Sequence, residues 1–353
     1  MAGPLSRCGF EWARRAAAGL AAVAALGAAG AAGAFDAALV ARAKAINAAG
    51  PPAEAAVARP TAHAQPDASL IKAEVLLARA HASPGPVDGV AGSNLRRAIK
   101  AFEQMQNLPE DGRLTAPVWR ALNGQAAHPI AAIYTTTAQD AAGPYYRDVG
   151  EDFVALSKLP TPGYVRPSEM LAERFQMSEA LLLALNPGAD FGKAGTQLVV
   201  MQPWVPPLAA VDHIEVDKAD ATVRAYDADD ALIASFPATV GSRERPSPSG
   251  VHKVVWPTFN PRYTYDPRKL SWGPRSHGVL VIQPGPNNPV GLVWIKLNAP
   301  GYGIHGTPDP DHIGKTASHG CVRLTNWDAI LLAHAVKPGV VVTFVHDRGD
   351  PTG

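Results

Sequence analysis

The sequence contains little cysteine and little net charge. Two cysteines in 353 residues cannot build a disulfide-stapled scaffold. A formal net charge of +1 argues against a nucleic-acid binder, because such proteins need a basic surface that neutralises phosphates. With 47% hydrophobic and 18% charged residues, the chain is globular and long enough for two or three domains with their own cores.

The only long apolar stretch lies at the start of the chain. Arginines precede the run "AAAGLAAVAALGAAGAA", and Ala32-Gly33-Ala34 has the small-x-small form of a cleavage site. The run is rich in Ala and Gly and falls short of the ~20 strongly apolar residues of a membrane span. We therefore expect a cleaved signal peptide at 1–34 rather than an uncleaved anchor. Its loss would leave 29 basic and 30 acidic residues, with Cys321 as the single thiol.

The following segments differ in composition and periodicity. An Ala- and Pro-rich stretch, 35–68, is predicted to be a tether. Residues 69–127 predict three short amphipathic helices, and "PGPVDGVAGSNLRRAIKAF" and "LPEDGRLTAPVWRAL" within them each run from Pro through a DG turn into an apolar helix face. This segment resembles the small peptidoglycan-binding helical domain. A generic three-helix bundle is the alternative.

A second module is predicted behind a linker at 128–163. Residues 164–205 contain two short helices, an "NPG" stop and the strand "GTQLVV", and they resemble a LysM-like cell-wall unit. The sequence Pro167-Ser168-Glu169-Met170 replaces the usual Gly-Asp-Thr opening, so sugar binding and a spacer role both remain open.

Residues 212–346 are predicted to be mostly β. The runs "HGVLVI", "LVWIKL" and "VVVTFV" are typical strands. One helix interrupts them, with Asn326 as its expected cap and Lys337-Pro338-Gly339 at its end. A sandwich or open barrel with one C-terminal helix follows, so the chain is predicted to be a multidomain α+β protein.

The segment "GIHGTPDPDHIGKTASHGCVRLTNW", residues 303–327, concentrates reactive side chains. A thiol becomes a useful nucleophile as thiolate, and "SHGCVRL" places an imidazole, a cation and backbone amides beside Cys321. If this segment is extended, His319, Cys321 and Arg323 share one face. Gly320 would let a substrate carbonyl approach the amides of an oxyanion hole, and Arg323 would clamp a carboxylate.

Two other interpretations of these residues stay open at this point. His305, His312, His319 and Cys321 are zinc-ligand types, although structural zinc sites usually pair close ligands twice and this segment has one close pair. The second interpretation is a buried, inert cysteine, although a Gly-rich loop is a poor core segment.

The motifs as a set resemble the catalytic domain of the L,D-transpeptidases, which have the YkuD-type fold. The matching segments are Ile304-His305-Gly306-Thr307, Ile313-Gly314-Lys315 and Ser318 to Leu324, with "PGPNNPVGLVW" and "SPSGVHKV" upstream. The resemblance implies that the Cys321 thiolate attacks the carbonyl of the third residue of a peptidoglycan tetrapeptide stem, normally diaminopimelate, and expels D-Ala. An amine then resolves the acyl-enzyme into a 3→3 cross-link, and no cofactor is required.

The resemblance also implies roles for the neighbouring residues. His305 is the general base, the backbone carbonyl of Gly306 orients it, and His319 lies near the oxyanion pocket with Gly320. Proximity in sequence alone would instead favour His319 as the base. Substrate contacts are expected from Arg323, Ser318 and Tyr302.

The expected protein is an exported, periplasmic monomer that works on the cell wall. Its partners are the stem peptides and glycan of peptidoglycan, and the acceptor amine belongs to another stem, an outer-membrane lipoprotein or a free D-amino acid. Neither nucleic acid nor an integral membrane span of the mature chain is expected. Two alternatives are a hydrolase, in which water resolves the acyl-enzyme, and a non-catalytic wall-binding protein.

Overall fold

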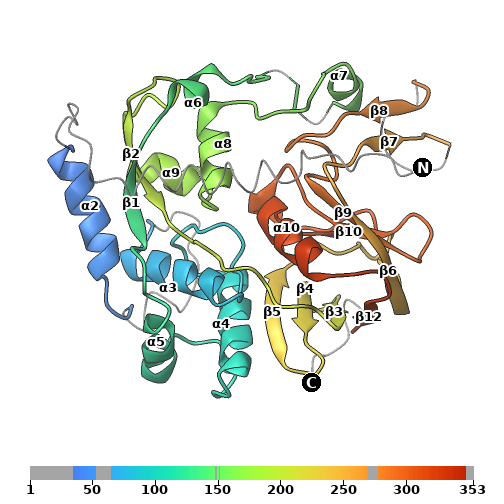
Figure 1. Ribbon diagram of the computed structural model, residues 1–353, viewed down its shortest axis with the longest axis horizontal. Helices are drawn as coiled ribbons and strands as arrows, with labels where there is room; N and C mark the ends of the chain where they lie inside the picture. The colour runs from blue at the N-terminus through green and yellow to red at the C-terminus, as the bar shows by residue number, and fades with distance from the viewer. Residues whose placement is uncertain are drawn as a thin grey trace, which may run out of the picture. The chain divides into compact units, whose positions relative to one another are not determined.

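The computed structural model describes residues 35–52, 65–147, 149–150, 152–268, 273 and 277–346 (Figure 1). The predicted signal peptide with Cys8, and residues 53–64 of the predicted tether, lie outside these ranges. The helices are α2 (Ala37–Ala48), α3 (Ala68–Arg79), α4 (Ser93–Met105), α5 (Ala116–Asn123), α6 (Ala138–Ala142), α7 (Phe153–Ser157), α8 (Pro167–Arg174), α9 (Glu179–Leu185), η2 (Pro310–His312) and α10 (Asn326–Ala335). The strands are β1 (Ala131–Thr135), β2 (Gln197–Met201), β3 (His213–Asp217), β4 (Thr222–Tyr226), β5 (Leu232–Pro237), β6 (Gly250–Phe259), β7 (Tyr263–Tyr265), β8 (Leu280–Ile282), β9 (Val293–Leu297), β10 (Gly303–His305), β11 (Val322–Arg323) and β12 (Val341–Val345). None of the helices in the described ranges is long and apolar enough to cross a membrane.

Helices α3, α4 and α5 form the predicted three-helix domain. Its two half-repeats share one device, in which a glycine with positive φ follows Asp and donates its amide to a glutamate side chain of the preceding helix. Gly89 donates to Glu74 and Gly112 donates to Glu103, both at 2.8 Å. Only glycine adopts such a φ without strain, so the DG turns are set by the sequence itself. The apolar helix faces meet in a core that includes Leu76, Ile99, Phe102 and Leu122.

The predicted tether is wrong in its first part, because α2 is a helix packed on the next module. Asn47 at the end of α2 accepts hydrogen bonds from the amides of Ile130 and Ala131 at 2.7 and 3.0 Å, and it donates to the carbonyl of Ala131 at 2.9 Å. The sequence "AALVARAKAINA" is rich in helix formers. Its ordering comes from contacts with residues more than eighty positions away, which composition does not reveal.

The segment predicted as a linker, 128–163, also contains regular structure. Strand β1 within it pairs antiparallel with β2, from Ala131 opposite Met201 to Thr135 opposite Gln197. Helices α6 and α7 follow β1, and α8 and α9 come before β2. We call β1, α8, α9 and β2 the βααβ module. A five-residue strand whose partner lies more than sixty residues later gives no local signal, so the linker prediction failed here.

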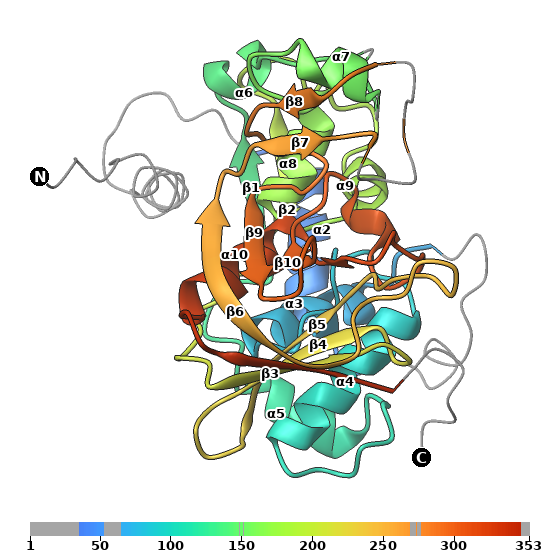
Figure 2. The same ribbon diagram turned by 90° about the vertical axis from the view of Figure 1, so that its right-hand side faces the viewer.

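The C-terminal domain is built on one sheet with the order β11-β10-β9-β6-β12-β3-β4-β5. Strands β10 and β11 are parallel, as are β12 and β3, and the other neighbours are antiparallel. The first part of β6 pairs with β12 and its last part with β9, with a register shift between Val254 and Trp256. Figure 2 shows β6 as the long curved strand that joins these two parts of the sheet. The α+β prediction, with a mostly-β domain and one C-terminal helix, is confirmed.

The N-cap of helix α10 lies one residue before the expected cap. Thr325 is the N-cap, and its Oγ1 accepts a hydrogen bond from the amide of Asp328 at 3.2 Å. Asn326, the expected cap, is instead the first helical residue. Thr and Asn are both good capping residues, so the sequence could not decide between them. The shift turns the Asn326 side chain away from the helix end and toward other segments.

The helical domain extends the edge of the sheet at β5. The amide of Ser235 donates to the carbonyl of His81 at 2.9 Å, and the amide of Ser83 donates to the carbonyl of Ser235 at 2.8 Å. The Ser83 hydroxyl also donates to Oδ2 of Asp328 in the first turn of α10, at 2.9 Å. The exposed edge of the sheet is thereby paired, and the domain is tied to the start of α10.

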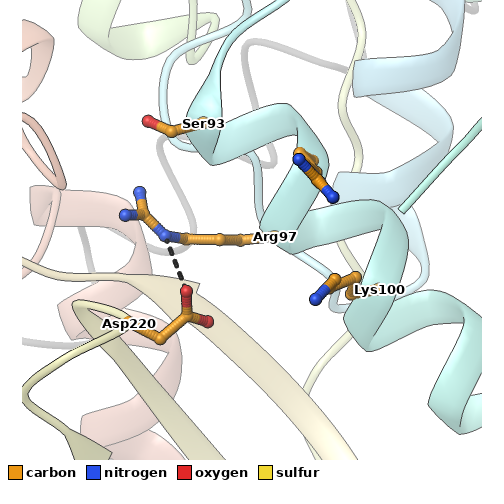
Figure 3. Close-up of a pocket in the computed structure, with 5 residues that line it drawn as sticks. Ser93, Arg97, Lys100 and Asp220 are labelled. Carbon is orange, nitrogen blue, oxygen red and sulfur yellow. Dashed lines mark hydrogen bonds and ion pairs between the residues drawn. The ribbon is translucent and has the colours of Figure 1, made fainter. Parts of the chain in front are cut away.

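A second junction involves α4. Arg97 approaches Asp220 in the β3–β4 turn at 3.3 Å, with Ser93 and Lys100 along the same side of the helix (Figure 3). Asn94 donates from Nδ2 to the carbonyl of Ile313 at 2.8 Å. Ile313 belongs to the loop that connects β10 with β11, so α4 holds part of the segment singled out by the sequence.

Candidate active site

Cys321 immediately precedes β11, and β11 lies beside β10. Ser318, Gly320, Val322 and Leu324 are buried, whereas His319, Cys321 and Arg323 are less so. This alternation agrees with the expected extended segment, although the regular strand covers only Val322–Arg323. The parallel register sets His305 opposite Arg323, so Cys321 lies just before the strand that neighbours the one carrying His305.

The thiol of Cys321 is held as a neutral group. Burial raises its pKa, and the Gly303 amide and the charge of Arg323 act in the opposite direction without cancelling that effect. The Sγ atom lies 3.8 Å from the carbonyl oxygen of Gly301, which can only accept a hydrogen bond. No hydrogen bond joins Sγ to His305 within the described ranges. Burial therefore disfavours the thiolate of Cys321 in the protein without substrate.

His305 is a buried, neutral imidazole with one fixed tautomer. Its side chain is buried, and this burial lowers its pKa to about 3, with the charge of Arg323 acting in the same direction. Its Nδ1 lies 2.7 Å from the carbonyl oxygen of Gly306. Because a carbonyl only accepts, Nδ1 carries the proton and Nε2 keeps a lone pair. The ring also stacks on Trp294, with centroids 5.3 Å apart.

Ser318 shapes the loop before Cys321. Its hydroxyl is buried, donates to the carbonyl of Cys321 at 2.5 Å and accepts from the amide of Gly320 at 3.1 Å. Both of these partners lie inside the loop that contains Ser318, and the substrate contact expected of this residue stays a prediction. The Gly320 amide, predicted to be an oxyanion donor, donates to the Ser318 hydroxyl in this structure.

Gly320 fits its position for steric reasons. Its φ is +116°, and a Cβ atom there would lie 2.9 Å from Cε1 of Tyr302 and 3.3 Å from the carbonyl oxygen of Pro246. Tyr302, predicted to contact substrate, packs over the nucleophile loop with a half-buried side chain. The aromatic ring and the glycine together fix the path of the chain into Cys321.

Arg323 supplies positive charge to the whole cluster. Its charge acts to lower the pKa of all three neighbouring groups, His305, His319 and Cys321. Burial acts in the same direction on the two histidines and in the opposite direction on Cys321, whose pKa is raised overall. Its Nε is buried without a hydrogen-bond partner, and Arg323 forms no ion pair with any described carboxylate. A buried donor without a partner is costly, so this atom is suited to receive a ligand acceptor.

Tyr263 and Trp294 adjoin the site without any local sign in the sequence. Burial raises the pKa of Tyr263, and the proximity of Cys321 adds to the increase. Trp294 faces His305 because the β9–β10 register pairs them. Both residues are distant in the sequence from Cys321, and the strand register explains the position of Trp294.

The two remaining histidines differ in position. His319 is exposed, and partial desolvation lowers its pKa, with contributions from Arg245 and Arg323. His312 is exposed in η2 and pairs with Asp309. No three His, Cys, Asp or Glu side chains among the described residues are arranged to hold a metal ion.

Comparison with known proteins gives two family matches. The model of the L,D-transpeptidase catalytic domain matches residues 211–344, and that of a peptidoglycan-binding domain matches residues 67–122. The YkuD protein of Bacillus licheniformis, an L,D-transpeptidase by name, is 31% identical over 184 residues, which cover 51% of this chain and 95% of the relative. YbiS of Escherichia coli, also an L,D-transpeptidase by name, is 29% identical over 52% of this chain and 62% of its own length.

Solved structures give a more distant likeness. L,D-transpeptidase 3 from Mycobacterium tuberculosis aligns with 45% of this chain and 77% of its own, at 15% identity and a TM-score of 0.32. That similarity is too low for a comparison of sites. The likeness to the Bacillus protein, which this chain covers almost completely, is sufficient to assign the family. The chain is a transpeptidase that belongs to the YkuD-type L,D-transpeptidase family.

Proposed function

We propose that this enzyme forms a thioester between Cys321 and the diaminopimelate carbonyl of a peptidoglycan tetrapeptide stem, releases D-Ala and transfers the acyl group to an amine. The observation that supports this most is the hydrogen bond from Nδ1 of His305 to the carbonyl of Gly306. It leaves Nε2 as the proton acceptor on the strand next to the nucleophile. The peptidoglycan-binding match of residues 67–122 supports the polymer as substrate.

Acylation follows from the two neutral groups. As the carbonyl approaches, Nε2 of His305 takes the thiol proton while Sγ forms a bond to the carbonyl carbon. The amide of Cys321 donates to no other group in the described part of the chain, so it is our candidate oxyanion donor, with His319 beside it. When the C–N bond breaks, the imidazolium returns its proton to the leaving amine of D-Ala.

Transfer reverses the proton movements. The acceptor amine attacks the thioester carbon, His305 removes a proton from that amine, and the C–S bond breaks to regenerate the Cys321 thiol. No water, redox agent or cofactor enters the balance. Arg323, with its unpaired buried Nε, is our candidate for binding a stem carboxylate, and Tyr302 is our candidate for lining the substrate.

We place this reaction in the periplasm, carried out by an exported monomer. The acceptor is a second stem, which gives a 3→3 cross-link, or alternatively a lipoprotein or a free D-amino acid. The family works on cell-wall peptides, and the apolar N-terminal run supports export.

Purified disaccharide-tetrapeptide muropeptides test this proposal. We expect the wild-type enzyme to release D-Ala and to produce 3→3 dimers, identified by mass spectrometry, and Cys321→Ala to produce neither. Trimmed tripeptides without dimers would instead identify a hydrolase. If wild-type enzyme leaves the stems intact and takes no carbapenem onto Cys321, the proposed function is wrong.

A further inference from the structure

The side chain of Asn326 is wedged against the residue that orients the catalytic base. A Cβ atom on Gly306 would lie 2.2 Å from Oδ1 of Asn326, and one on Gly291 would lie 2.1 Å from the same oxygen. That oxygen accepts a hydrogen bond from the amide of Leu292 at 3.0 Å. Asn326 is almost fully buried, so its amide group defines where the Gly306 peptide can sit.

The other end of the Asn326 amide is held by the βααβ module. Its Nδ2 donates to Oε1 of Glu173 on α8 at 3.1 Å and to the carbonyl of Pro286 at 3.3 Å. The hydroxyl of Tyr164 donates to the same Glu173 oxygen at 3.2 Å. A carboxyl group from outside the catalytic domain thus fixes which way the Asn326 amide faces, because the amide nitrogen points at an oxygen of Glu173.

We propose that Glu173 is a positioning residue for the catalytic base and acts on His305 through Asn326 and Gly306. This inference rests on the proposed role of His305. The connection runs from Glu173 Oε1 to Asn326 Nδ2, from Asn326 Oδ1 to the Gly306 backbone, and from the Gly306 carbonyl to Nδ1 of His305. The βααβ module is then part of the catalytic apparatus rather than a separate spacer.

Loss of the Glu173 acceptor has a specific consequence. Asn326 Nδ2 would keep only its longer bond to Pro286, and the amide could rotate away from Leu292. The Gly306 backbone would then lose its packing contact with Asn326 Oδ1, its carbonyl could shift, and the His305 proton would redistribute between Nδ1 and Nε2. In a molecule with the proton on Nε2, that nitrogen has no free lone pair to accept the thiol proton. The loss of Glu173 therefore slows the chemical step.

A neighbouring contact on the same helix provides a matched control. Glu169, one turn before Glu173, accepts from Nδ2 of Asn287 at 2.9 Å and makes no contact with Asn326. Glu169→Ala therefore weakens the same interface without touching the chain of contacts to His305. Glu173→Gln retains an acceptor oxygen for Asn326, so comparing it with Glu173→Ala tests whether that oxygen is needed.

The rate of Cys321 acylation by imipenem and the kcat and KM of D-Ala release are measured for each variant. We expect Glu173→Ala to lower the acylation rate and kcat roughly tenfold or more with KM within about twofold, because only the positioning of the base is lost. Glu173→Gln and Glu169→Ala should stay within about threefold of wild type. Equal losses in Glu169→Ala and Glu173→Ala, or wild-type rates in Glu173→Ala, would overturn the proposal.

A second measurement is independent of turnover. In the Cys321→Ala background, ¹⁵N shifts of the His305 ring report which nitrogen carries the proton. We expect Nδ1–H in the background protein and a mixture after Glu173→Ala is added. An unchanged ring spectrum contradicts the positioning role, whatever the outcome for transpeptidation. If the ring spectrum changes as expected but the wild-type enzyme is not acylated, the proposed function is contradicted and the positioning role is not.

Discussion

At the scale of single residues, burial favours the neutral forms of both proposed reacting groups, the Cys321 thiol and the His305 imidazole. Burial favours the uncharged form of each, so it raises the pKa of Cys321 and lowers that of His305. The charge of Arg323 favours a thiolate but opposes an imidazolium. A preformed thiolate–imidazolium pair is therefore disfavoured, which supports the proposal that the thiol proton is transferred during attack on the carbonyl.

This protonation pattern predicts the pH dependence of acylation. With its pKa near 3, His305 stays neutral and able to accept a proton throughout the range from pH 5 to pH 8. The raised pKa of the thiol delays thiolate formation to alkaline pH. We expect the rate of imipenem acylation to be nearly level from pH 5 to pH 8 and to change only above it. A rate that halves near pH 6.5, the ordinary value for histidine, would contradict this.

The two candidate histidines should differ when each is replaced. His305→Ala removes the imidazole whose Nδ1 donates to the Gly306 carbonyl, and it should lower acylation by about a hundredfold or more. His319→Ala removes an exposed ring and should leave a larger share of the activity. Acylation rates from intact mass are compared, with thermal unfolding showing that both variants fold. Equal and complete loss in two folded variants would show that His305 is not the distinct base.

At the scale of elements, the sequence predicts local patterns well and long-range partners poorly. The alternation around Cys321 and the DG turns depend on neighbouring residues, and the structure has both. The sequence did not reveal that the Ser318 hydroxyl bonds to Gly320 and Cys321 within its own loop. Asn326 was expected to cap a helix, and its actual contacts come from Glu173, 153 positions earlier.

The turn at Gly320 allows an element-scale prediction. Gly320→Ala puts a side chain at a φ of +116° and against Tyr302, so we expect a stability loss of about 1–2 kcal/mol and a large loss of acylation. Gly339→Ala is the matched control, because Gly339 has a φ of +96° and open space around its Cβ position. Both variants should unfold at lower temperature, and only Gly320→Ala should acylate slowly. Comparable acylation in the two would mean that the loop tolerates the change.

At the scale of the whole chain, both accessory modules meet the catalytic domain at the first turn of α10. Ser83 of the helical domain bonds to Asp328, and Glu173 of the βααβ module bonds to Asn326. One hydrophobic core lies mainly in residues 43–201 and another in residues 211–344, so these polar contacts join two separately packed regions. The family resemblances of the modules could not predict these contacts, because each resemblance describes a single domain and not how that domain packs against its neighbours.

The buried carboxyl at this junction makes stability depend on pH. Burial raises the pKa of Asp328 to about 7, whereas an unfolded aspartate titrates near 3.9. Between these values the folded chain keeps a proton that the unfolded chain has lost, so the contribution of Asp328 to stability falls as pH rises from about 4 to about 7 and is constant above that. An asparagine side chain at this position cannot titrate, so Asp328→Asn should unfold near the wild-type temperature at pH 4.5 and at a temperature several degrees higher at pH 7.5. Thermal unfolding across this range measures the difference, with the exposed substitution Asp229→Asn expected to follow wild type at every pH. A difference between Asp328→Asn and wild type that does not grow with pH would show that the Ser83–Asp328 contact holds a charged carboxylate, and that the junction is a conventional ionic hydrogen bond.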